Sequence, residues 1–465
     1  MSQIHLAIVN ASVDGINMMV SWVRENPSYI TTYNIIPPII GTSIITIIAG
    51  MCNYRRKEET IFDCYVYDYS MYNFSNRDSK TCGFCCVYFI MFICCVLSGI
   101  QLNPIIEQLT YCNIEDNICS NQSPITVTML SSSKTVYSAP LNNLSPKTKY
   151  NYLLSGSKTP IQFTTLNPEN PRVAFIGDFG YENAVAFKAL YNTMDEYDMI
   201  IHVGDIAYDL NNHADDFMHM IEPISSLKPY MTTPGNHEAM NNFTYYKALF
   251  NNPRLFYSFN IGSAHFISFS SEFLFNPQLY SNYNVMQQYK WLEHTLRENI
   301  NATIKIAYAH RPMYCSLYGH HDRCIVDTEI MRKGMSYDGN TRIAPLEELL
   351  HKYGIDIYFA GHIHSYERTR PMYDKHTSID KHATGYKHTS IDKKGIVHIL
   401  NGVGGSREGL DISKTINPSW LAYHNTTYGF GILNINEKDV NWRQYATTKE
   451  GNLDEIDKID YNFER

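Results

Sequence analysis

The sequence has no block of basic residues and no large excess of either charge. It contains 38 Lys and Arg against 46 Asp and Glu, which gives a net charge of −8 over 465 residues. A protein that binds nucleic acid or an anionic membrane by charge normally carries a basic patch or stripe. We therefore expect no nucleic-acid partner. The length allows two or three domains and a large hydrophobic core.

Cysteine is scarce over most of the chain, and the start has none of the features of a signal peptide. Nine of the eleven cysteines lie between Cys52 and Cys119, and only Cys315 and Cys324 follow. The opening MSQIHLAIVNAS lacks a basic n-region and a long apolar stretch. Either the natural N-terminus lies upstream, or the protein is targeted in another way.

Glycosylation sequons are frequent, which favours the secretory route over the cytosol. Together they predict a glycoprotein that is secreted or lysosomal/vacuolar, whereas free thiols in a cytosolic protein would be the alternative. The seven Asn-x-Ser/Thr sequons begin at Asn10, Asn73, Asn121, Asn143, Asn242, Asn301 and Asn425.

One region, residues 35–110, differs from the rest because it contains long apolar runs and most of the cysteines. The run from Gly83 to Ile100 is about long enough to span a bilayer. Three interpretations remain open: a transmembrane segment, a buried insertion, or translated sequence such as a retained intron that is absent from the mature protein. A membrane span here would divide the domain around it.

The rest of the chain separates into two patterns. Residues 1–34 and 111–168 contain short alternating runs such as INMMVSWV and predict a small β-sandwich. Residues 169–448 alternate β-rich and helical runs, and residues 449–465 form a tail. An amphipathic helix ending at Gly354 is predicted by apolar residues at i, i+3, i+4 and i+7, namely Leu346, Leu349, Leu350 and Tyr353.

Metal-binding side chains follow directly after five apolar strands, whose carboxyl ends are expected to meet at one edge of a sheet. A single Asp or His there is usually a turn former, a helix cap or a surface group. GDxG or HxH alone is weak, but GNHE followed by GHIH, with two earlier Gly-Asp strand ends, favours one shared site. The residues are Asp178, Asp205, Asn236, His237, His310, His362 and His364.

These side chains also indicate which metals the site binds. Carboxylates, an amide and imidazoles without a thiolate suit iron, zinc or manganese rather than copper(I). They are too many for one tetrahedral ion, so we expect two ions that share a carboxylate, with Asp205 as the bridge. Tyr208 stands three residues after Asp205. A phenol stays neutral near pH 7 unless a strong cation, such as iron(III), stabilises the phenolate.

The blocks GDFG, GDIAY, GNHE, AHRPMYCS and GHIHSYER resemble, in order and spacing, the motifs of the purple acid phosphatases. These are dinuclear phosphomonoesterases of the calcineurin-like metallophosphoesterase superfamily. The resemblance covers about residues 169–448 and includes NGVGGSREGL and YGFGILNIN. Related protein phosphatases have GDxVDRG where this chain has GDIAYDL, and so lack the tyrosine.

The resemblance implies an α+β protein of the plant-type, two-domain form. An α/β metallophosphoesterase domain, with a β-sandwich core flanked by helices, would occupy residues 169–448. A fibronectin-like β-sandwich, built from residues 1–34 and 111–168, would precede it. QIHLAI and MMVSWV look like the opening strands of that domain. Residues 35–110 have no counterpart in the family and interrupt it as an atypical insertion.

The resemblance also assigns roles to residues. Iron(III) would be held by Asp178, Tyr208 and His364, with Asp205 bridging. Zinc, manganese or iron(II) would be held by Asn236, His310 and His362. His237 resembles the outer-sphere histidine that binds substrate phosphate. His320 and His321 stand near the family's acid–base histidines, one residue further along than in plant members. Cys315 and Cys324 would close a small disulfide across that loop.

The implied activity is that of an acid phosphatase which hydrolyses phosphate monoesters, on small molecules or phosphoproteins, with a metal-held hydroxide as nucleophile. Because a protonated histidine must coexist with that hydroxide, an acidic optimum is expected. Two alternatives remain: a phosphodiesterase or nucleotide pyrophosphatase on the same metals, and a non-catalytic binding protein tethered to a membrane through residues 83–100. Whether the protein forms a homodimer is open.

Overall fold

The computed structural model describes residues 4–12, 15–25, 107–131, 134–275, 277–319, 322–334, 345–377, 395–437 and 439–462. The interpretations of the apolar run at 83–100 lie outside these residues, as do nearly all of the 35–110 insertion and the roles of His320 and His321. None of the helices in the described part of the chain is both long enough and apolar enough to cross a membrane.

The N-terminal strands form two layers that share a core. In one layer β1 (Ile4–Ser12), β2 (Gly15–Glu25), β6 (Lys134–Leu144) and β5 (Thr126–Ser131) lie side by side in that order. The other layer has the order β4 (Cys119–Gln122), β3 (Leu109–Asn113), β7 (Lys149–Leu154), β8 (Ile161–Thr164). Buried side chains of both layers, including Trp22 and Tyr152, belong to one cluster. The fibronectin-like assignment and the boundary at residue 168 stay predictions.

The C-terminal part of the chain extends the first of these layers into a larger sheet and adds a separate sheet. Among the described residues, one sheet of eleven strands has the order β20-β16-β19-β15-β14-β13-β12-β1-β2-β6-β5, and one of six has the order β11-β10-β9-β21-β22-β23. A short parallel pairing of Ala11 with Ile261 joins β1 to β12. The N-terminal strands therefore continue the larger sheet rather than standing apart from it.

The strand bounds are as follows. The larger sheet also contains β12 (Tyr257–Ile261), β13 (Ala264–Ser268), β14 (Ile304–Tyr308), β15 (Ile357–Ala360), β16 (Tyr366–Thr369), β19 (Val397–Asn401) and β20 (Leu421–Asn425). The smaller sheet contains β9 (Arg172–Ile176), β10 (Met199–Val203), β11 (Tyr230–Thr233), β21 (Gly429–Ile435), β22 (Asp439–Thr447) and β23 (Leu453–Asn462). β17 (Met372–Tyr373) and β18 (His376–Thr377) form a short hairpin.

Successive side chains of a strand alternate between two buried clusters, one between the sheets and one that contains the helices. In β9, Val173 and Phe175 join the buried cluster between the two sheets, whereas Ala174 and Ile176 join a second cluster that contains the helices. Successive strand side chains point to opposite faces, so each central strand is covered on both sides. The rings of Phe175 and Phe359, from opposite sheets, stack with centroids 3.7 Å apart. The expected β-sandwich core flanked by helices is therefore confirmed.

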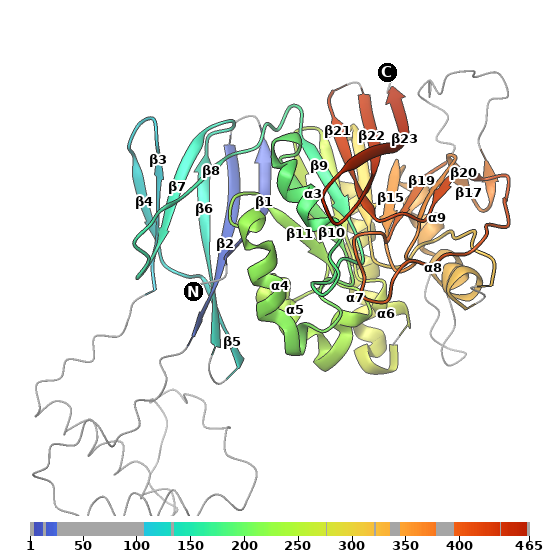
Figure 1. Ribbon diagram of the computed structural model, residues 1–465, viewed down its shortest axis with the longest axis horizontal. Helices are drawn as coiled ribbons and strands as arrows, with labels where there is room; N and C mark the ends of the chain where they lie inside the picture. The colour runs from blue at the N-terminus through green and yellow to red at the C-terminus, as the bar shows by residue number, and fades with distance from the viewer. Residues whose placement is uncertain are drawn as a thin grey trace, which may run out of the picture. The chain divides into compact units, whose positions relative to one another are not determined.

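The helices pack outside the sheets (Figure 1). They are α3 (Phe187–Asn192), α4 (Leu210–Ser225), α5 (Thr244–Leu249), α6 (Glu272–Phe275), α7 (Pro277–Glu298), α8 (Thr328–Lys333) and α9 (Leu346–Lys352). The predicted amphipathic helix is confirmed as α9, whose leucines are buried. Its end follows from Gly354, which has φ +68° and lets the next N–H bond back to Leu350.

A buried ion pair joins the two sheets near their C-terminal strands. Asp457 of β23 accepts hydrogen bonds from Nε and Nη2 of Arg368 in β16, at 2.6 and 2.8 Å. The hydroxyl of Tyr366 donates to the same carboxylate at 2.7 Å and accepts from the indole N–H of Trp442 at 2.9 Å. Both oxygens of the carboxylate and two nitrogens of the guanidinium thus have partners, which a buried charge requires.

Candidate metal centre

The expected site residues come from the ends of both sheets. Asp178 follows β9, Asp205 and Tyr208 follow β10, and Asn236 follows β11, all in the six-stranded sheet. The histidines come from the eleven-stranded sheet, where His310 follows β14, and His362 and His364 follow β15. The contacts described below bring these seven residues together, as the strand-end argument predicts.

One group of donor atoms consists of Asp178, Tyr208 and His364. The phenol oxygen of Tyr208 lies 2.8 Å from Nε2 of His364 and 3.4 Å from Oδ1 of Asp178. Nε2 of His364 lies 3.4 Å from the same carboxylate oxygen. All three side chains are buried. Three atoms that can each donate an electron pair therefore converge at a buried point.

A second group forms around His310. Its Nδ1 lies 3.0 Å from the carbonyl oxygen of Val203, which can only accept, so Nδ1 carries the proton. In the neutral ring Nε2 then has a lone pair, and it faces Oδ2 of Asp205 at 3.2 Å and Oδ1 of Asn236 at 3.1 Å. Ligand atoms of Asp205, His310 and His362 all lie within 4.8 Å of one another. Lone pairs that face one another in this way require a proton or a cation between them.

The charges of the cluster agree with that requirement. Burial lowers the pKa of His310, but the carboxylates of Asp205, Asp178 and Glu272 together outweigh burial and raise it to about 10. The pKa of Tyr208 is raised, first by burial and then by the charges of Asp178 and Asp205. Without a cation the site thus takes up a proton and keeps its phenol neutral. The residues present fit a pair of metal ions, since positive charge is what the cluster lacks.

Backbone strain marks the same residues. Asp178, Asp205, Tyr208 and His362 have φ values of +53°, +50°, +62° and +75°. Residues other than glycine rarely adopt this left-handed conformation, and where they do the surrounding structure has to hold them there. Four of the seven expected ligands share the feature, which is common at functional sites.

Two glycines make room for the carboxylates. A Cβ atom on Gly235 would lie 2.2 Å from Oδ1 of Asp205, and one on Gly361 would lie 2.3 Å from Oδ2 of Asp178. Both contacts are far inside van der Waals distance. The Gly in GNHE and in GHIH is therefore required because each strand-end loop passes directly over the carboxylate of another.

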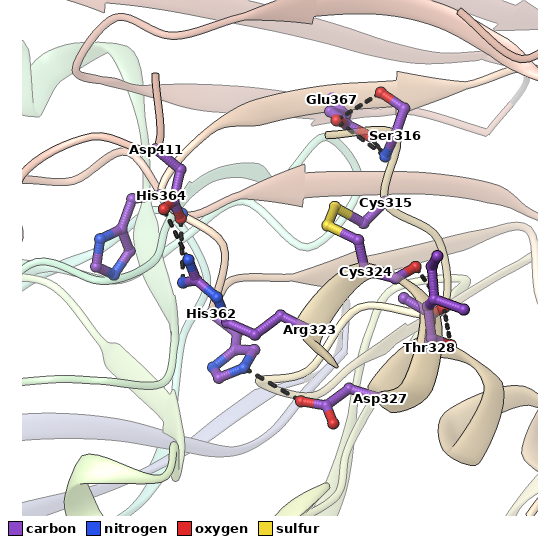
Figure 2. The surroundings of a disulfide bond; sticks show 11 residues. Cys315, Ser316, Arg323, Cys324, Asp327, Thr328, His362, His364, Glu367 and Asp411 are labelled. Atoms are coloured by element: carbon purple, nitrogen blue, oxygen red, sulfur yellow. Dashed lines mark hydrogen bonds and ion pairs between the residues drawn. A yellow bond between two sulfur atoms is a disulfide. The ribbon is translucent and has the colours of Figure 1, made fainter. Parts of the chain in front are cut away.

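His362 of the GHIH block is held both by a member of the cluster and by residues outside it. The backbone N–H of His362 donates to Oδ2 of Asp178 at 2.8 Å. Nε2 of His362 lies 3.1 Å from Nη1 of Arg311 and 3.6 Å from Oδ2 of Asp327, as Figure 2 shows for Asp327. Because Nε2 is engaged there, Nδ1 is the nitrogen of His362 left for a metal. Burial, followed by the charge of Arg311, lowers the pKa of His362 well below its usual range.

His237 lies beside the two groups and is partly open to solvent, with 25% of its side chain exposed. Its Nδ1 donates to the carbonyl oxygen of Tyr208 at 3.2 Å, and its ring packs on the ring of Tyr208 with centroids 4.6 Å apart. Nε2 lies 3.8 Å from Oδ2 of Asp205 and 3.5 Å from Oε1 of Glu408. The ring is thus oriented through one nitrogen and presents the other toward the cluster.

Sequence reasoning missed several residues that support the site. Glu238 accepts the backbone N–H groups of Ile206 and Gly235, each at 2.8 Å, and so ties the GDIAY loop to the GNHE loop. Burial, then the charge of Asp205, raises its pKa to about 8. Its place in the GNHE block was a usable signal. Asp327 and Asp411 have no such signal, because Asp327 ends a short helical turn before α8 and Asp411 lies in a loop, both outside the motif blocks.

The expected disulfide is present. Cys315 and Cys324 are bonded to each other, and a second bond joins Cys112 to Cys119 at the paired ends of β3 and β4. Figure 2 shows the first of these beside His362 and His364. The loop that carries the expected acid–base histidines is therefore cross-linked at its two ends.

Comparison with known proteins agrees with this geometry. The profile of the calcineurin-like phosphoesterases matches residues 171–366, and that of the iron/zinc purple acid phosphatase-like protein C matches residues 395–455. Acid phosphatase type 7 of Homo sapiens is 36% identical over 61% of this chain and 66% of its own length. The Mus musculus protein of the same name is 34% identical over 68% of this chain and 75% of its own.

Among solved structures, the purple acid phosphatase from yellow lupin (Lupinus luteus) seeds superposes with a TM-score of 0.66 at 18% identity. The superposition covers 99% of this chain and 74% of the lupin chain, and it establishes the likeness of the fold. Fold and strand-end motifs together define a calcineurin-like metallophosphoesterase. Within that class, the chain belongs to the purple acid phosphatase family.

Proposed function

We propose that this protein is an acid phosphatase that hydrolyses phosphate monoesters at a pair of metal ions. The observation that carries the proposal is the arrangement of two convergent groups of buried lone-pair atoms next to a partly exposed histidine. The two groups are linked through neighbouring strand-end loops, so two ions bound there would lie close together. The relatives named acid phosphatase type 7 support the reaction class and the acidic working range.

Each ion would have its own set of ligands. Asp178, Tyr208 and His364 would hold iron(III), and Asn236, His310 and His362 would hold zinc, manganese or iron(II), with Asp205 between the two. The phenol of Tyr208 supports a trivalent ion on its side, because only a strong positive charge overcomes the burial and the carboxylates that keep this phenol protonated. The amide and imidazoles of the other set suit a divalent ion.

When bound, such a pair of ions neutralises phosphate oxygens and lowers the pKa of water toward neutrality. The protein's own residues would do the rest. The hydrogen bond from Nδ1 of His237 to the carbonyl of Tyr208 fixes the orientation of the ring. Nε2 of a protonated His237 is therefore already oriented to donate to a phosphate oxygen. A placed donor of this kind typically contributes about 10²–10⁴-fold to the rate.

The substrate would be a phosphate ester on a small molecule or on a protein, and the protein would work in a secreted or lysosomal/vacuolar setting. The sequons and the disulfides support that setting. A homodimer and an attachment to membranes through residues 83–100 remain outside what the described residues address.

The test uses aerobically purified full-length protein, its metal content and its visible absorption spectrum. Hydrolysis of p-nitrophenyl phosphate and of bis(p-nitrophenyl) phosphate is followed in parallel, before and after chelation, and after zinc and iron are restored. We expect a violet protein that hydrolyses the monoester at acidic pH and loses this activity with its metals.

Three other results would contradict the proposal, each in a different way. Faster hydrolysis of the diester would replace the proposal with the phosphodiesterase or nucleotide pyrophosphatase alternative. A protein that binds both metals but hydrolyses neither ester would favour a non-catalytic binding protein, and partition of the full chain between membrane and soluble fractions would test its tether. A colourless but active protein would contradict phenolate ligation by Tyr208.

A further inference from the structure

The disulfide-closed segment, comprising residues 315–319 and 322–327, lies beside the GHIH block: its Asp327 faces His362 directly, and its Arg323 reaches the main chain of His364 through Asp411. Figure 2 shows these contacts. None of the segment's side chains belongs to the metal ligands expected above. Its charged residues nevertheless meet His362 and His364 through two separate carboxylates, Asp327 and Asp411.

The first contact runs from Arg323 through Asp411 to His364. Arg323 donates from Nη2 to Oδ1 of Asp411 at 2.8 Å and from Nη1 to Oδ2 at 3.2 Å. Oδ2 also accepts the backbone N–H of His364 at 2.8 Å, and the backbone N–H of Asp411 returns to the carbonyl of His364 at 2.9 Å. The main chain of His364 is therefore held on both sides by one aspartate, and that aspartate is held by Arg323.

The second contact runs from Asp327 to His362. Asp327 pairs with Arg311, and its Oδ2 lies 3.6 Å from Nε2 of His362. Arg311 is itself held at Nε and Nη2 by Glu272, at 2.8 and 3.1 Å. Because the side chains of Asp327 and Arg311 are only 16% and 12% exposed, solvent screens this pair less than a surface one.

When His362 binds a metal, Asp327 would accept a hydrogen bond from the other ring nitrogen. A histidine that gives the lone pair of Nδ1 to a metal carries its proton on Nε2. That proton cannot point at Arg311, which offers only donors, but it can point at the carboxylate of Asp327. The nearby carboxylate thus selects the tautomer in which His362 binds through Nδ1, as outer carboxylates do for other metal-bound histidines.

The Cys315–Cys324 disulfide fixes the position of Arg323 and Asp327, the residues that make the two contacts. Cys324 stands next to Arg323 and three residues before Asp327, while Cys315 stands close behind the end of β14. At the Cys315 end, the N–H and hydroxyl of Ser316 donate to Glu367 of β16, and the N–H of Tyr318 donates to the carbonyl of Lys414. The bond therefore ties Arg323 and Asp327 to a part of the segment that is already anchored to the sheet.

We propose that the disulfide-closed segment is a positioning device for the metal centre, in which Asp327 orients His362, Arg323 orients His364 through Asp411, and the Cys315–Cys324 bond holds both in register. Reduction of that bond would loosen both histidines together. The proposal rests on the metal centre of the proposed function, but it concerns affinity for metal rather than the reaction.

The test measures the affinity of metal-free full-length protein for zinc, by competition with a chromophoric chelator. Asp327→Asn keeps the shape of the side chain and removes its charge, and its matched control is Glu329→Gln, whose carboxylate pairs with Lys333 on the exposed face of α8. Arg323→Gln is matched by Lys333→Gln. A third variant, Cys315→Ser/Cys324→Ser, leaves every charge in place. The thermal unfolding of each metal-free variant is measured alongside.

We expect Asp327→Asn to weaken zinc binding by about 10–100-fold, as loss of an outer carboxylate generally does. Arg323→Gln and the double cysteine variant should weaken it in the same direction, and the two controls should match the wild type. If Asp327→Asn also lowers the unfolding temperature of the metal-free protein, its weaker zinc binding could come from a damaged fold. The zinc affinity of the double cysteine variant then decides whether the segment positions the histidines.

Wild-type zinc affinity in both Asp327→Asn and the double cysteine variant would overturn the proposal. A wild-type protein that binds no zinc at all would instead overturn the metal centre and the proposed function. Asp327→Glu, which keeps the carboxylate, should bind zinc more tightly than Asp327→Asn if the role is positioning by charge. Equal affinities of these two variants would contradict that role.

Discussion

The phenol oxygen of Tyr208 and Nε2 of His364 lie 2.8 Å apart, although 156 residues separate them along the chain. Tyr208 stands on the loop after β10 and His364 on the loop after β15, so each belongs to a different sheet. The carboxylate of Asp178 completes the group. This convergence is the observation on which the proposed role of Tyr208 as a metal ligand rests.

Tyr208→Phe should abolish the visible absorption of the iron-loaded protein while leaving the fold intact. On the proposed ligand set the band would arise from the phenolate of Tyr208 on iron(III), and phenylalanine has no oxygen to bind. The measurement is the visible spectrum and iron content of the purified variant. Tyr230→Phe, which removes the hydroxyl of another buried tyrosine, is the control and should keep the band. A violet Tyr208→Phe protein would contradict the assignment.

Asp205→Asn should release metal and lower kcat by about 10³-fold or more, since ions at such a site supply several kcal/mol of transition-state stabilisation. Metal analysis by mass spectrometry and turnover of p-nitrophenyl phosphate check this. Asp209→Asn makes the same chemical change four residues on. Asp209 caps α4 by accepting the N–H of Asn212 at 3.2 Å, and Asn caps helices about as well as Asp. That variant should behave as the wild type.

His237→Ala should keep both metals and lower kcat by about 10²–10⁴-fold, because the ring contacts the cluster only from its solvent side. Metal content and kcat are measured on one preparation. His294→Ala, on the exposed surface of α7, serves as the control. Metal loss in His237→Ala together with its activity would mean that this histidine is a ligand rather than a substrate-binding group.

Glu367 should contribute more to the stability of the fold in acid than at neutral pH. Burial raises its pKa from 4.5 to about 7, although Ser316 donates to it at 2.7 Å. The folded protein therefore binds this proton more tightly than the unfolded chain does. Stability from this group is full below about pH 4.5, falls by about 3 kcal/mol between about pH 4.5 and about pH 7, and changes little above that.

Urea unfolding at pH 5 and pH 8 measures that difference for the Glu367 proton. Glu367→Gln should flatten the dependence and make the variant more stable than the wild type at pH 8, because Gln has no proton to lose. Glu329→Gln, on the exposed surface of α8, should leave the wild-type pH dependence unchanged. An unaltered slope in Glu367→Gln would show that other groups are responsible.

Asp457→Ala should destabilise the fold by about 3–5 kcal/mol, because it leaves the guanidinium of Arg368 buried without its carboxylate. Replacing both residues together, as Arg368→Met/Asp457→Leu, should cost less than the single change. Unfolding free energies of the two variants provide the comparison. A double variant that is less stable than Asp457→Ala would mean that the pair contributes more than charge compensation.

Much of the metal centre could be predicted from sequence because parallel strands deliver their ends to one edge, and short motifs mark those ends. Asp178, Asp205 and His310 each follow an apolar run that is easily identified as a strand. The supporting residues could not be found in this way. Asp411 reaches His364 only because a loop between β19 and β20 folds back on the site, and no local pattern encodes that path.

The same limit applies to the fold. α9 was predictable because four apolar residues repeat at helical spacing, and α7 carries a similar repeat in Val285, Leu292 and Leu296, although polar residues and tyrosines between them weaken the pattern. The continuity of the larger sheet rests on the pairing of Ala11 with Ile261, residues 250 positions apart. Contacts at such separations depend on the whole topology rather than on local composition.

The division of the ligands between two sheets has a consequence for the protein's lifetime. Asp178 and Asp205 follow strands of one sheet, and His310 and His364 follow strands of the other. An ion bound by residues of both sheets would therefore cross-link them. Free metal at 100 times its dissociation constant would add about 2.7 kcal/mol to stability. Chains that fold where metal is scarce would open more often and reach proteases sooner. The amount of folded protein in a compartment would then follow the supply of iron as well as the rate of synthesis.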